Sequence, residues 1–400
     1  MTPISLVRKA LIPLLNRVDS TAHTGLLVQR GLRVWQGKET KDSKDKDDKK
    51  DLIHVITNVK SSELYQLAFD RWLLHTYKGD GSANLNKDIA SLNATIDGRL
   101  MTGLSIGGTL ETGVTTHHTY GMPILAGSAV KGAVRAYAEN LFSKRDSEGK
   151  IILVKDDKGI ERSTIVETMQ PILNILFGAD EEENQPNAGY LIWHDAWWIP
   201  TLTQNGDYSS SDDAKPFVGE IVTVHHHKYY SDKTGRIEAL DMESPIPNQQ
   251  LAVQGSFYFV IEGESQWVDF AKKLLHDTLQ QFGMGAKGAS GYGYFKVNEQ
   301  LLKKRYLALS LLNSNSDDPL QNLSIKIKSL DKTRLVDNLS KDSTKFFDEL
   351  QLNKEDEQDC KTLANLLYEF HRETIESWTK LKGQKNPERA LKFIEKYRSS

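Results

Sequence analysis

The chain contains very little cysteine and no long hydrophobic run. Cys360 is the single cysteine among 400 residues, so no disulfide can form within the chain and no cysteine-based zinc site is possible. This usage favours a reducing, cytoplasmic location. No run of about 18 apolar residues occurs, so we predict no membrane-spanning segment. The first residues also lack the unbroken apolar stretch and the small-residue cleavage site of a signal peptide.

An excess of positive charge is also missing. The formal net charge is −3, so the overall composition does not indicate nucleic-acid binding. Binding depends on where charges lie rather than on their sum, and a local basic patch is compatible with this balance. A chain of 400 residues exceeds one ordinary hydrophobic core, so we expect two or three folded units.

The N-terminal part alternates between apolar and charged stretches. Residues 4–17 carry apolar side chains at helical spacing and predict an amphipathic helix, and residues 24–32 predict packed structure. Residues 41–51 contain only Lys, Asp and one Ser, so they have nothing to bury. We therefore predict that residues 1–58 form an N-terminal helix and a solvated or disordered insert. A helix follows, with an apolar face made of Leu64, Leu67, Ala68, Trp72 and Leu73.

Glycine is concentrated in residues 283–293, between residues at helical spacing and a short apolar strand over residues 294–297. Glycine permits positive φ and lets a partner approach the bare backbone. Successive exposed N–H groups suit an anion, and Lys287 adds a positive charge. A structural turn that stops a helix at Gly283 would have the same composition. No Gly-Lys-Ser/Thr sequence follows, which excludes a P-loop.

A second informative region covers residues 100–135. Residues 100–110 alternate loosely and predict a strand, and a connection then leads to a helix with Ser128 as its predicted N-cap. The free N–H groups and positive dipole end of such a helix are a natural phosphate seat. Lys131 and Arg135 would project from one face of this helix, although a solvated helix often carries two such residues.

Further strands are predicted over residues 191–198, 221–224 and 257–261, which are rich in bulky apolar side chains. His194 and Asp195 are adjacent and would face opposite sides of a strand, so we interpret them as structural. The histidines at 225–227 suggest zinc, but a strand would offer at most two of them on one side and no carboxylate or cysteine completes the shell. We therefore predict no metal and favour a polar, aromatic rim that stacks on nucleotides. The polar residues 228–250 predict a protruding hairpin.

The region after Glu299 has a different character. Apolar residues at helical spacing between 363 and 378 predict a long amphipathic helix that ends near Gly383. Another helix is predicted from Asn386, with Pro387 in its first turn. We predict a separate helical module over residues 300–400.

The order of elements over residues 59–299 is strand, helix, strand, strand, helix, glycine loop and strand. This order predicts an α+β, ferredoxin-like (RRM-like) domain, followed by the all-α C-terminal module. The ferredoxin-like fold hosts many unrelated functions, so the motifs carry more information than the fold.

Two motifs resemble the RAMP superfamily, the RNA-binding subunits of CRISPR effector complexes. Gly283-x-Gly285 followed by Gly291-x-Gly293 resembles its glycine loop, and residues 120–123 running into 127–135 resemble its first helix. Residues 193–196, 226–230 and 244–247 narrow the resemblance to the subunit-six family of the Cmr module in type III-B complexes. The resemblance covers roughly residues 100–297. Ala126 replaces the usual proline, and the insert and the residues beyond 299 have no counterpart.

The resemblance implies a non-catalytic, cofactor-free RNA-binding subunit. Such a subunit caps a filament near the 3′ part of the CRISPR RNA and supports guide–target duplex formation in antiviral defence. Its implied partners are CRISPR RNA, target RNA and other Cmr subunits, with no membrane. The hairpin would be a thumb that wedges into the duplex, and the two glycine-containing segments would converge on the RNA. The implied RNA-binding residues are Gly127, Ser128, Lys131, Arg135, Gly285, Lys287, Gly288, Ser290, Gly291 and Gly293, with His226, Tyr229 and Tyr230 at the base of the hairpin.

Three alternatives stay open. A RAMP endoribonuclease would need a general base, for which His117 and His118 are the candidates. A target-cleaving subunit would place an aspartate in the same connection, but none occurs between Gly98 and Lys144. The chain could also be another end subunit of a type III complex, or a protein-interaction scaffold centred on its C-terminal helices.

Overall fold

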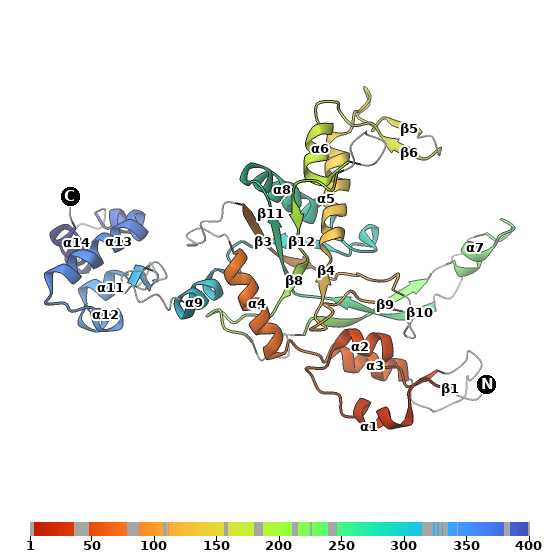
Figure 1. Ribbon diagram of the computed structural model, residues 1–400, viewed down its shortest axis with the longest axis horizontal. Helices are drawn as coiled ribbons and strands as arrows, with labels where there is room; N and C mark the ends of the chain where they lie inside the picture. The colour runs from red at the N-terminus through yellow and green to blue at the C-terminus, as the bar shows by residue number, and fades with distance from the viewer. Residues whose placement is uncertain are drawn as a thin grey trace. The chain divides into compact units, whose positions relative to one another are not determined.

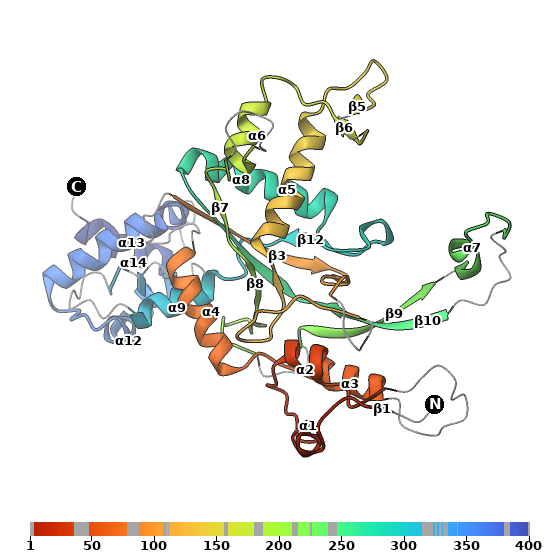
Figure 2. The ribbon, with the colours of Figure 1, turned by 45° about the vertical axis from the view of Figure 1, so that its right-hand side comes forward.

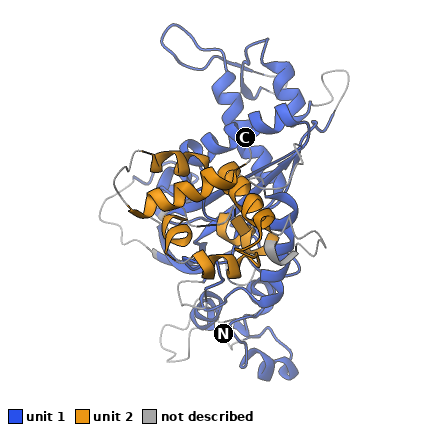
Figure 3. Cartoon of the chain, turned by 90° about the vertical axis from the view of Figure 1, so that its left-hand side faces the viewer, with its two compact units in different colours: residues 1–301 blue, residues 302–400 orange. Residues whose placement is uncertain are grey.

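The computed structural model divides the chain into two compact units, residues 1–301 and 302–400 (Figure 3). None of the described helices is long and apolar enough to cross a membrane. The described residues are 4–35, 48–77, 88–106, 110, 112–155, 159–179, 187–209, 215–224, 226–238, 246–313, 323–324, 326–327, 330, 335–341, 343–379 and 385–398.

An antiparallel sheet forms the centre of the first unit. Its strand order is β12-β3-β11-β8-β4, and β7 pairs with the end of β11. In chain order, β3, α5, β8, β11, α8 and β12 give the spatial strand order fourth, first, third, second, which is the ferredoxin-like arrangement that the sequence predicts. The strands are β3 (Ile89–Asp97), β4 (Ile124–Leu125), β7 (Ile192–Trp193), β8 (Ala196–Ile199), β11 (Ser256–Glu262) and β12 (Tyr294–Val297).

Helices cover both faces of this sheet. On one face lie α5 (Gly127–Phe142) and α8 (Ser265–Asp277), where Phe257 and Phe259 also meet Phe295 (Figures 1 and 2). On the other face α4 (Glu63–Thr76) places Phe69 against Tyr258, with ring centroids 6.0 Å apart. A strand with both faces covered reads as a continuous apolar run, and residues 257–261 are such a run.

The first strand differs from the prediction over residues 100–110. The strand is β3, which ends at Asp97 before Gly98 at φ 89°, and Leu100 and Met101 form only isolated bridges. The pattern hid β3 because this strand buries polar residues, Ser91 and Asn93, among small apolar ones. Hydrophobicity alone therefore pointed to the wrong segment.

The N-terminal helix predicted over residues 4–17 is also wrong. Residues Ile4–Ser5 form β1, which pairs with β2 (Val34–Trp35), and only Ile12–Leu15 form a helix, α1, after a 3₁₀ turn (Lys9–Leu11). Pro13 lies in the first turn of α1, and a proline there cannot continue a helix that comes from the N-terminal side. The packed segment predicted next is α2 (Thr24–Arg30).

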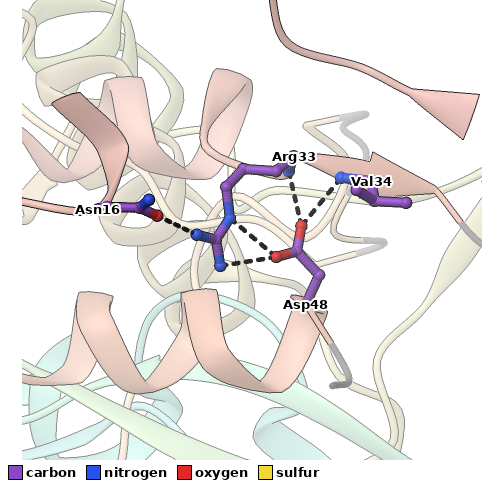
Figure 4. A network of polar contacts seen from close by, with 4 residues as sticks. All are labelled: Asn16, Arg33, Val34 and Asp48. Carbon is purple, nitrogen blue, oxygen red and sulfur yellow. Dashed lines mark hydrogen bonds and ion pairs between the residues drawn. The ribbon is translucent and has the colours of Figure 1, made fainter. Parts of the chain in front are cut away.

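The charged insert ends earlier than predicted. Residues 41–47 lie outside the described residues, but residues 48–51 form the first turn of α3 (Asp48–Thr57). Asp48 accepts hydrogen bonds from the backbone N–H groups of Arg33 at 2.7 Å and Val34 at 2.9 Å, and it pairs with the Arg33 guanidinium (Figure 4). The side chain of Asp48 is only 15% exposed, because these donors replace its water.

The predicted helix at α4 is present, but its buried face is different. Leu64 and Leu67 are 63% and 57% exposed, whereas Tyr65, Phe69 and Leu73 are fully buried. Residues 65, 69 and 73 are spaced by four, so the two aromatic rings and a leucine share one stripe of the helix. The stripe of Tyr65, Phe69 and Leu73, and not the predicted leucine-rich face, therefore packs on the sheet.

The protruding hairpin begins before residue 228. Its strands are β9 (Phe217–Val224) and β10 (Ile246–Val253), which pair antiparallel along their whole length. Phe217 and residues 251–253 are buried and root the hairpin in the unit. Beyond the strand ends lies α7 (His227–Ser231), as Figures 1 and 2 show. His225 and residues 239–245, which include Ser244 and Pro245 of the proposed motif, lie outside the described residues.

Between α5 and β7, the described residues form β5 (Leu153–Lys155), β6 (Glu161–Ser163) and α6 (Gln170–Phe177).

The second unit has the helical character that the sequence predicts. Its core includes Phe346, Phe347 and Leu363, and Asp356 caps the longest helix by accepting hydrogen bonds from two backbone N–H groups. The helices are α9 (Lys303–Asn313), α11 (Leu335–Ser340), α12 (Ser343–Glu349), α13 (Glu357–Trp378) and α14 (Lys385–Tyr397).

Candidate nucleic-acid interface

The glycine loop is closed at its base by backbone hydrogen bonds. After α8 the chain makes a π-helical turn (Thr278–Phe282), and this turn ends at Gly283. Met284 donates to the Gly293 carbonyl at 2.8 Å, and Gly293 donates to the Arg99 carbonyl at 2.9 Å. Ala286 donates to the Met101 carbonyl at 2.7 Å. The loop is therefore tied both to itself and to the segment after β3.

The glycines of this loop do two different jobs. A Cβ on Gly285 or Gly293 would lie 2.4 Å from the Met101 oxygen or 1.9 Å from the Met284 oxygen, and both residues have positive φ. Such positions accept only glycine, so their role is structural. At Gly288 and Gly291 a Cβ would meet no atom within 4 Å. These two glycines leave open space at the tip.

The tip of the loop combines free amides with a free positive charge. Lys287 adopts the left-handed conformation at φ 61°, and residues Gly288–Ser290 form a 3₁₀ turn. Lys287, Ser290 and Gly291 are exposed. Among the described residues, the Lys287 ammonium has no hydrogen-bond or ion-pair partner, and the amides of Gly288 and Ala289 donate to nothing. Such a group of donors suits a phosphate oxygen.

At the N-terminus of α5, the carboxylate of Asp195 occupies the place that a bound anion would take. The helix begins at Gly127 rather than after Ser128, so the predicted Ser128 cap is wrong. Ala126 holds the cap position without a capping side chain, and the Gly127 N–H instead donates to Asp195 Oδ1 at 2.7 Å. A carboxylate at this position satisfies a free amide and the helix dipole, so the predicted phosphate seat is filled from within the chain.

The other residues predicted on α5 also have partners within the chain, except exposed Ser128. A Cβ on Gly127 would lie 1.9 Å from the Trp193 oxygen, so this glycine lets α5 rest on β7. Lys131 donates to the Ala188 carbonyl at 2.7 Å, and burial together with Arg135 lowers its pKa. Arg135 pairs with Glu139 at 2.7 Å.

The two glycine-containing segments do not converge as predicted, although α5 and α8 pack on the same face. Tyr294, directly after the loop, pairs with Asp97 of β3. At the other segment, Gly127 lies against Trp193, which pairs with Ile261 of β11. Ile261 in turn pairs with Ala90 of β3. Residues 90 and 97 are seven positions apart along β3, which corresponds to about 23 Å. The two segments therefore lie near opposite ends of the strand.

The aromatic residues predicted at the base of the hairpin lie beyond its strands. Tyr229 and Tyr230 are 46% and 78% exposed, and their ring centroids are 5.3 Å apart in an edge-on arrangement. His226 precedes α7 in the left-handed conformation. The break in strand geometry after Val224 places these side chains at the far end of the hairpin.

A pocket of about 410 Å³ in the first unit escaped the sequence analysis. Although His194 and Asp195 have the structural contacts that we inferred, with His194 3.0 Å from Glu262, they also border this pocket. The available signal was a polar His-Asp pair between tryptophans, a sequence that an ordinary buried strand rarely has. The lining residues are Trp72, His117, Trp193, His194, Asp195 and Trp197. Within the described part of the chain, no three His, Cys, Asp or Glu residues are grouped to hold a metal ion.

The ferredoxin-like sheet and the glycine loop agree with the RAMP superfamily resemblance that the motifs indicated. The RAMP superfamily model matches residues 75–296, more than half of the 400 residues, so the chain belongs to the RAMP superfamily. A comparison with curated protein sequences gives no match.

Several solved structures are similar. A chain of the type III-B Cmr-beta complex bound to cognate target RNA has 18% identity and a TM-score of 0.40, over 64% of this chain and 76% of that one. Cmr6 from Pyrococcus furiosus has 22% identity and a TM-score of 0.31, over 53% and 98%. A chain of a type IV-B CRISPR complex has 12% identity and a TM-score of 0.32, over 52% and 90%.

Proposed function

We propose that this chain is a non-catalytic, RNA-binding architectural subunit of a type III-B CRISPR (Cmr) effector complex. In this role it caps the filament near the 3′ part of the CRISPR RNA and supports pairing between guide and target RNA. The observation that carries the proposal is the open tip of the glycine loop in a chain of the RAMP superfamily. The partners are CRISPR RNA, target RNA and the neighbouring Cmr subunits.

The chemistry of the tip suits sequence-independent binding. A subunit that holds any guide must contact phosphates, since base edges differ from guide to guide. Lys287 supplies a positive charge, and the amides of Gly288 and Ala289 supply donors that need no side chain. Because Gly288 and Gly291 leave the tip open, a phosphate can approach the backbone closely.

The hairpin supplies a second contact. Tyr229 and Tyr230 are exposed at its far end, and aromatic rings stack on bases of any sequence. We assign the hairpin the role of separating or bracing the guide–target duplex, with α7 as the part that meets RNA.

Hydrogen bonding at His117 argues against this residue as the general base of the endoribonuclease alternative. His117 Nδ1 lies 3.1 Å from the Thr119 N–H, which can only donate, so Nδ1 is the acceptor. In the neutral ring the proton is then on Nε2, and no free lone pair remains to act as a general base. The alternative predicts that His117→Ala or His118→Ala abolishes RNA cleavage by the complex. A cleavage assay with both variants tests it.

The proposal is tested by co-expression with the other Cmr subunits, followed by affinity purification and quantification of bound RNA. We expect Lys287→Gln to lower RNA retention and to reduce the slope of log affinity against log salt by about 1, because one phosphate contact is lost. Lys131→Gln is the matched control, because its ammonium already bonds to Ala188. Equal RNA retention by the wild type and the Lys287→Gln variant would remove the glycine loop from the interface.

A further inference from the structure

Three segments that are far apart in the sequence build the pocket described above. Trp72 comes from α4, His117 from the connection before α5, and residues 193–197 from the turn between β7 and β8. Its volume of about 410 Å³ lies within the range of small-ligand sites, ~300–1,000 Å³. Neither the phosphate-binding loop nor the hairpin contributes to its lining.

The aromatic walls are held in place before any ligand arrives. Trp197 stacks on Tyr65 with ring centroids 5.8 Å apart and an interplanar angle of 13°, and the Tyr65 hydroxyl donates to the Trp198 carbonyl. Trp72 lies nearly parallel to Trp197, at 6.4 Å and 24°, and the His117 ring meets Trp197 at 4.9 Å. Flat, fixed aromatic surfaces suit another flat ring, because little side-chain entropy is lost on stacking.

The pocket also has polar groups that nothing else uses. His117 carries its proton on Nε2 because Nδ1 accepts from Thr119. Asp195 uses Oδ1 to cap α5, and Oδ2 accepts no hydrogen bond from the described residues. The lining therefore offers the His117 N–H as a donor and the Asp195 carboxylate as an acceptor beside the aromatic walls.

We infer that this pocket binds a single unstacked nucleobase of the RNA. The polar edges of RNA bases carry both hydrogen-bond donors and acceptors, which matches the donor and the acceptor in the lining. Enzymes and RNA-binding modules that take a base out of its stack read it in the same manner, by stacking and by hydrogen bonds to its pairing edge. The inference rests on the proposed function, because RNA must first reach the chain.

Other occupants fit the lining less well. The Asp195 carboxylate repels a phosphate, and it also occupies the helix N-terminus that would attract one. An aliphatic side chain of a partner protein would cover the His117 N–H and the Asp195 carboxylate without pairing them, which costs about 1–3 kcal/mol for each unsatisfied group. A base satisfies both the aromatic and the polar parts of the lining.

The test uses the RNA-loaded complex, with the full chain, reconstituted on guide RNA that carries 4-thiouridine. After irradiation, mass spectrometry locates the crosslinked peptides. We expect crosslinks to peptides that contain Trp72 or residues 193–197, and about a tenfold lower yield in Trp72→Ala, since stacking on one aromatic side chain is worth about 1–3 kcal/mol. Trp72→Phe keeps an aromatic wall, so it should retain the crosslinks. Trp267→Phe, on α8, is the control.

The outcomes separate this inference from the proposed function. Retained RNA with no crosslink to the pocket, or with crosslinks unchanged in Trp72→Ala, overturns the base pocket alone. A complex without RNA contradicts the proposed function. In that case, failure of oligouridylate to quench the tryptophan fluorescence of the full-length chain overturns the pocket as well.

Discussion

The glycine loop and the start of α5 have similar compositions but opposite structural roles. Both combine glycines with a serine and a lysine, and both were predicted to hold phosphate. At the start of α5, Gly127 is pressed against a backbone oxygen and Lys131 bonds to a carbonyl. At the loop tip, Gly288 meets nothing and Lys287 has no partner among the described residues.

The difference shows that a motif has two layers. Some of its residues make the backbone geometry possible, and others leave open space at the surface. In the loop, Gly293 belongs to the first layer and Gly291 to the second, although both have positive φ. In α5 the first layer accounts for Gly127, and a carboxylate from β7–β8 has taken the place of the ligand.

The largest expected effect is a loss of stability when a side chain is introduced at the base of the glycine loop. Gly293→Ala combines a strained positive φ with a Cβ 1.9 Å from the Met284 oxygen, so we expect a loss of about 2–4 kcal/mol in the free energy of unfolding. Gly288→Ala, which has open space, is the matched control and should stay within about 0.5 kcal/mol. Urea unfolding followed by tryptophan fluorescence measures both. Equal losses would mean that the tip is as constrained as the base.

The same comparison can be made within α5. Gly127→Ala forces a Cβ to 1.9 Å from the Trp193 oxygen and should cost about 1–3 kcal/mol, because helix and strand must move apart. Gly132 is interior to the same helix and has nothing within 4 Å, so Gly132→Ala should stabilise by about 0.5–1 kcal/mol. Thermal unfolding of the two variants should shift in opposite directions. A stabilised Gly127→Ala variant would disprove the close packing of α5 on β7.

Removing the internal anion sharpens the comparison further. Asp195→Ala should cost about 1 kcal/mol, the usual value of a helix cap, since the Gly127 N–H loses its acceptor. The freed helix start should then bind inorganic phosphate more tightly than the wild type does, which calorimetry can measure. A variant with unchanged stability and no gain in phosphate binding would show that Asp195 does not hold this seat.

The smallest expected effect is the contribution of His117 to the pH dependence of stability. Burial lowers the pKa of His117 below its ordinary 6.5; Asp195 acts in the opposite sense, and His118 and His23 add to the lowering. The folded chain therefore binds this proton less readily than the unfolded chain does. The associated stability is complete above pH 6.5 and falls as the pH drops below that value, levelling off under the folded pKa. Comparing the pH dependence of unfolding in the wild type and His117→Gln measures it, and identical curves would contradict the shift.

Much of the fold could be predicted because it depends on strong local patterns. The apolar run of β11, the helical spacing of α8 and α13, and the glycine loop each specify their own element. The missed elements depend on distant partners. The strand β3 buries Ser91 and Asn93 in the centre of the sheet, where β11 pairs along one side of β3 and β12 pairs with its C-terminal half on the other. No local pattern reports such pairing.

The candidate site was harder to predict for the same reason. The spacing of Lys131 and Arg135 does not reveal their partners. Lys131 donates to the Ala188 carbonyl, and Arg135 forms an ion pair with Glu139. Likewise, Trp72 and Trp197 lie 125 positions apart in the sequence and meet only in the folded chain. Lys287, which the sequence analysis named as the positive charge of the loop, is exposed, because the neighbouring small residues have no side chains large enough to bury it.

The contact between Arg33 and Asp48 has a practical consequence (Figure 4). It joins the chain just before the charged insert to the chain just after it, through two backbone N–H groups and a guanidinium. The two ends of the insert are thus held together whatever its length or composition. An affinity tag or a fluorophore could replace residues 37–46 there, because the Arg33–Asp48 contact would still hold the two flanking segments together.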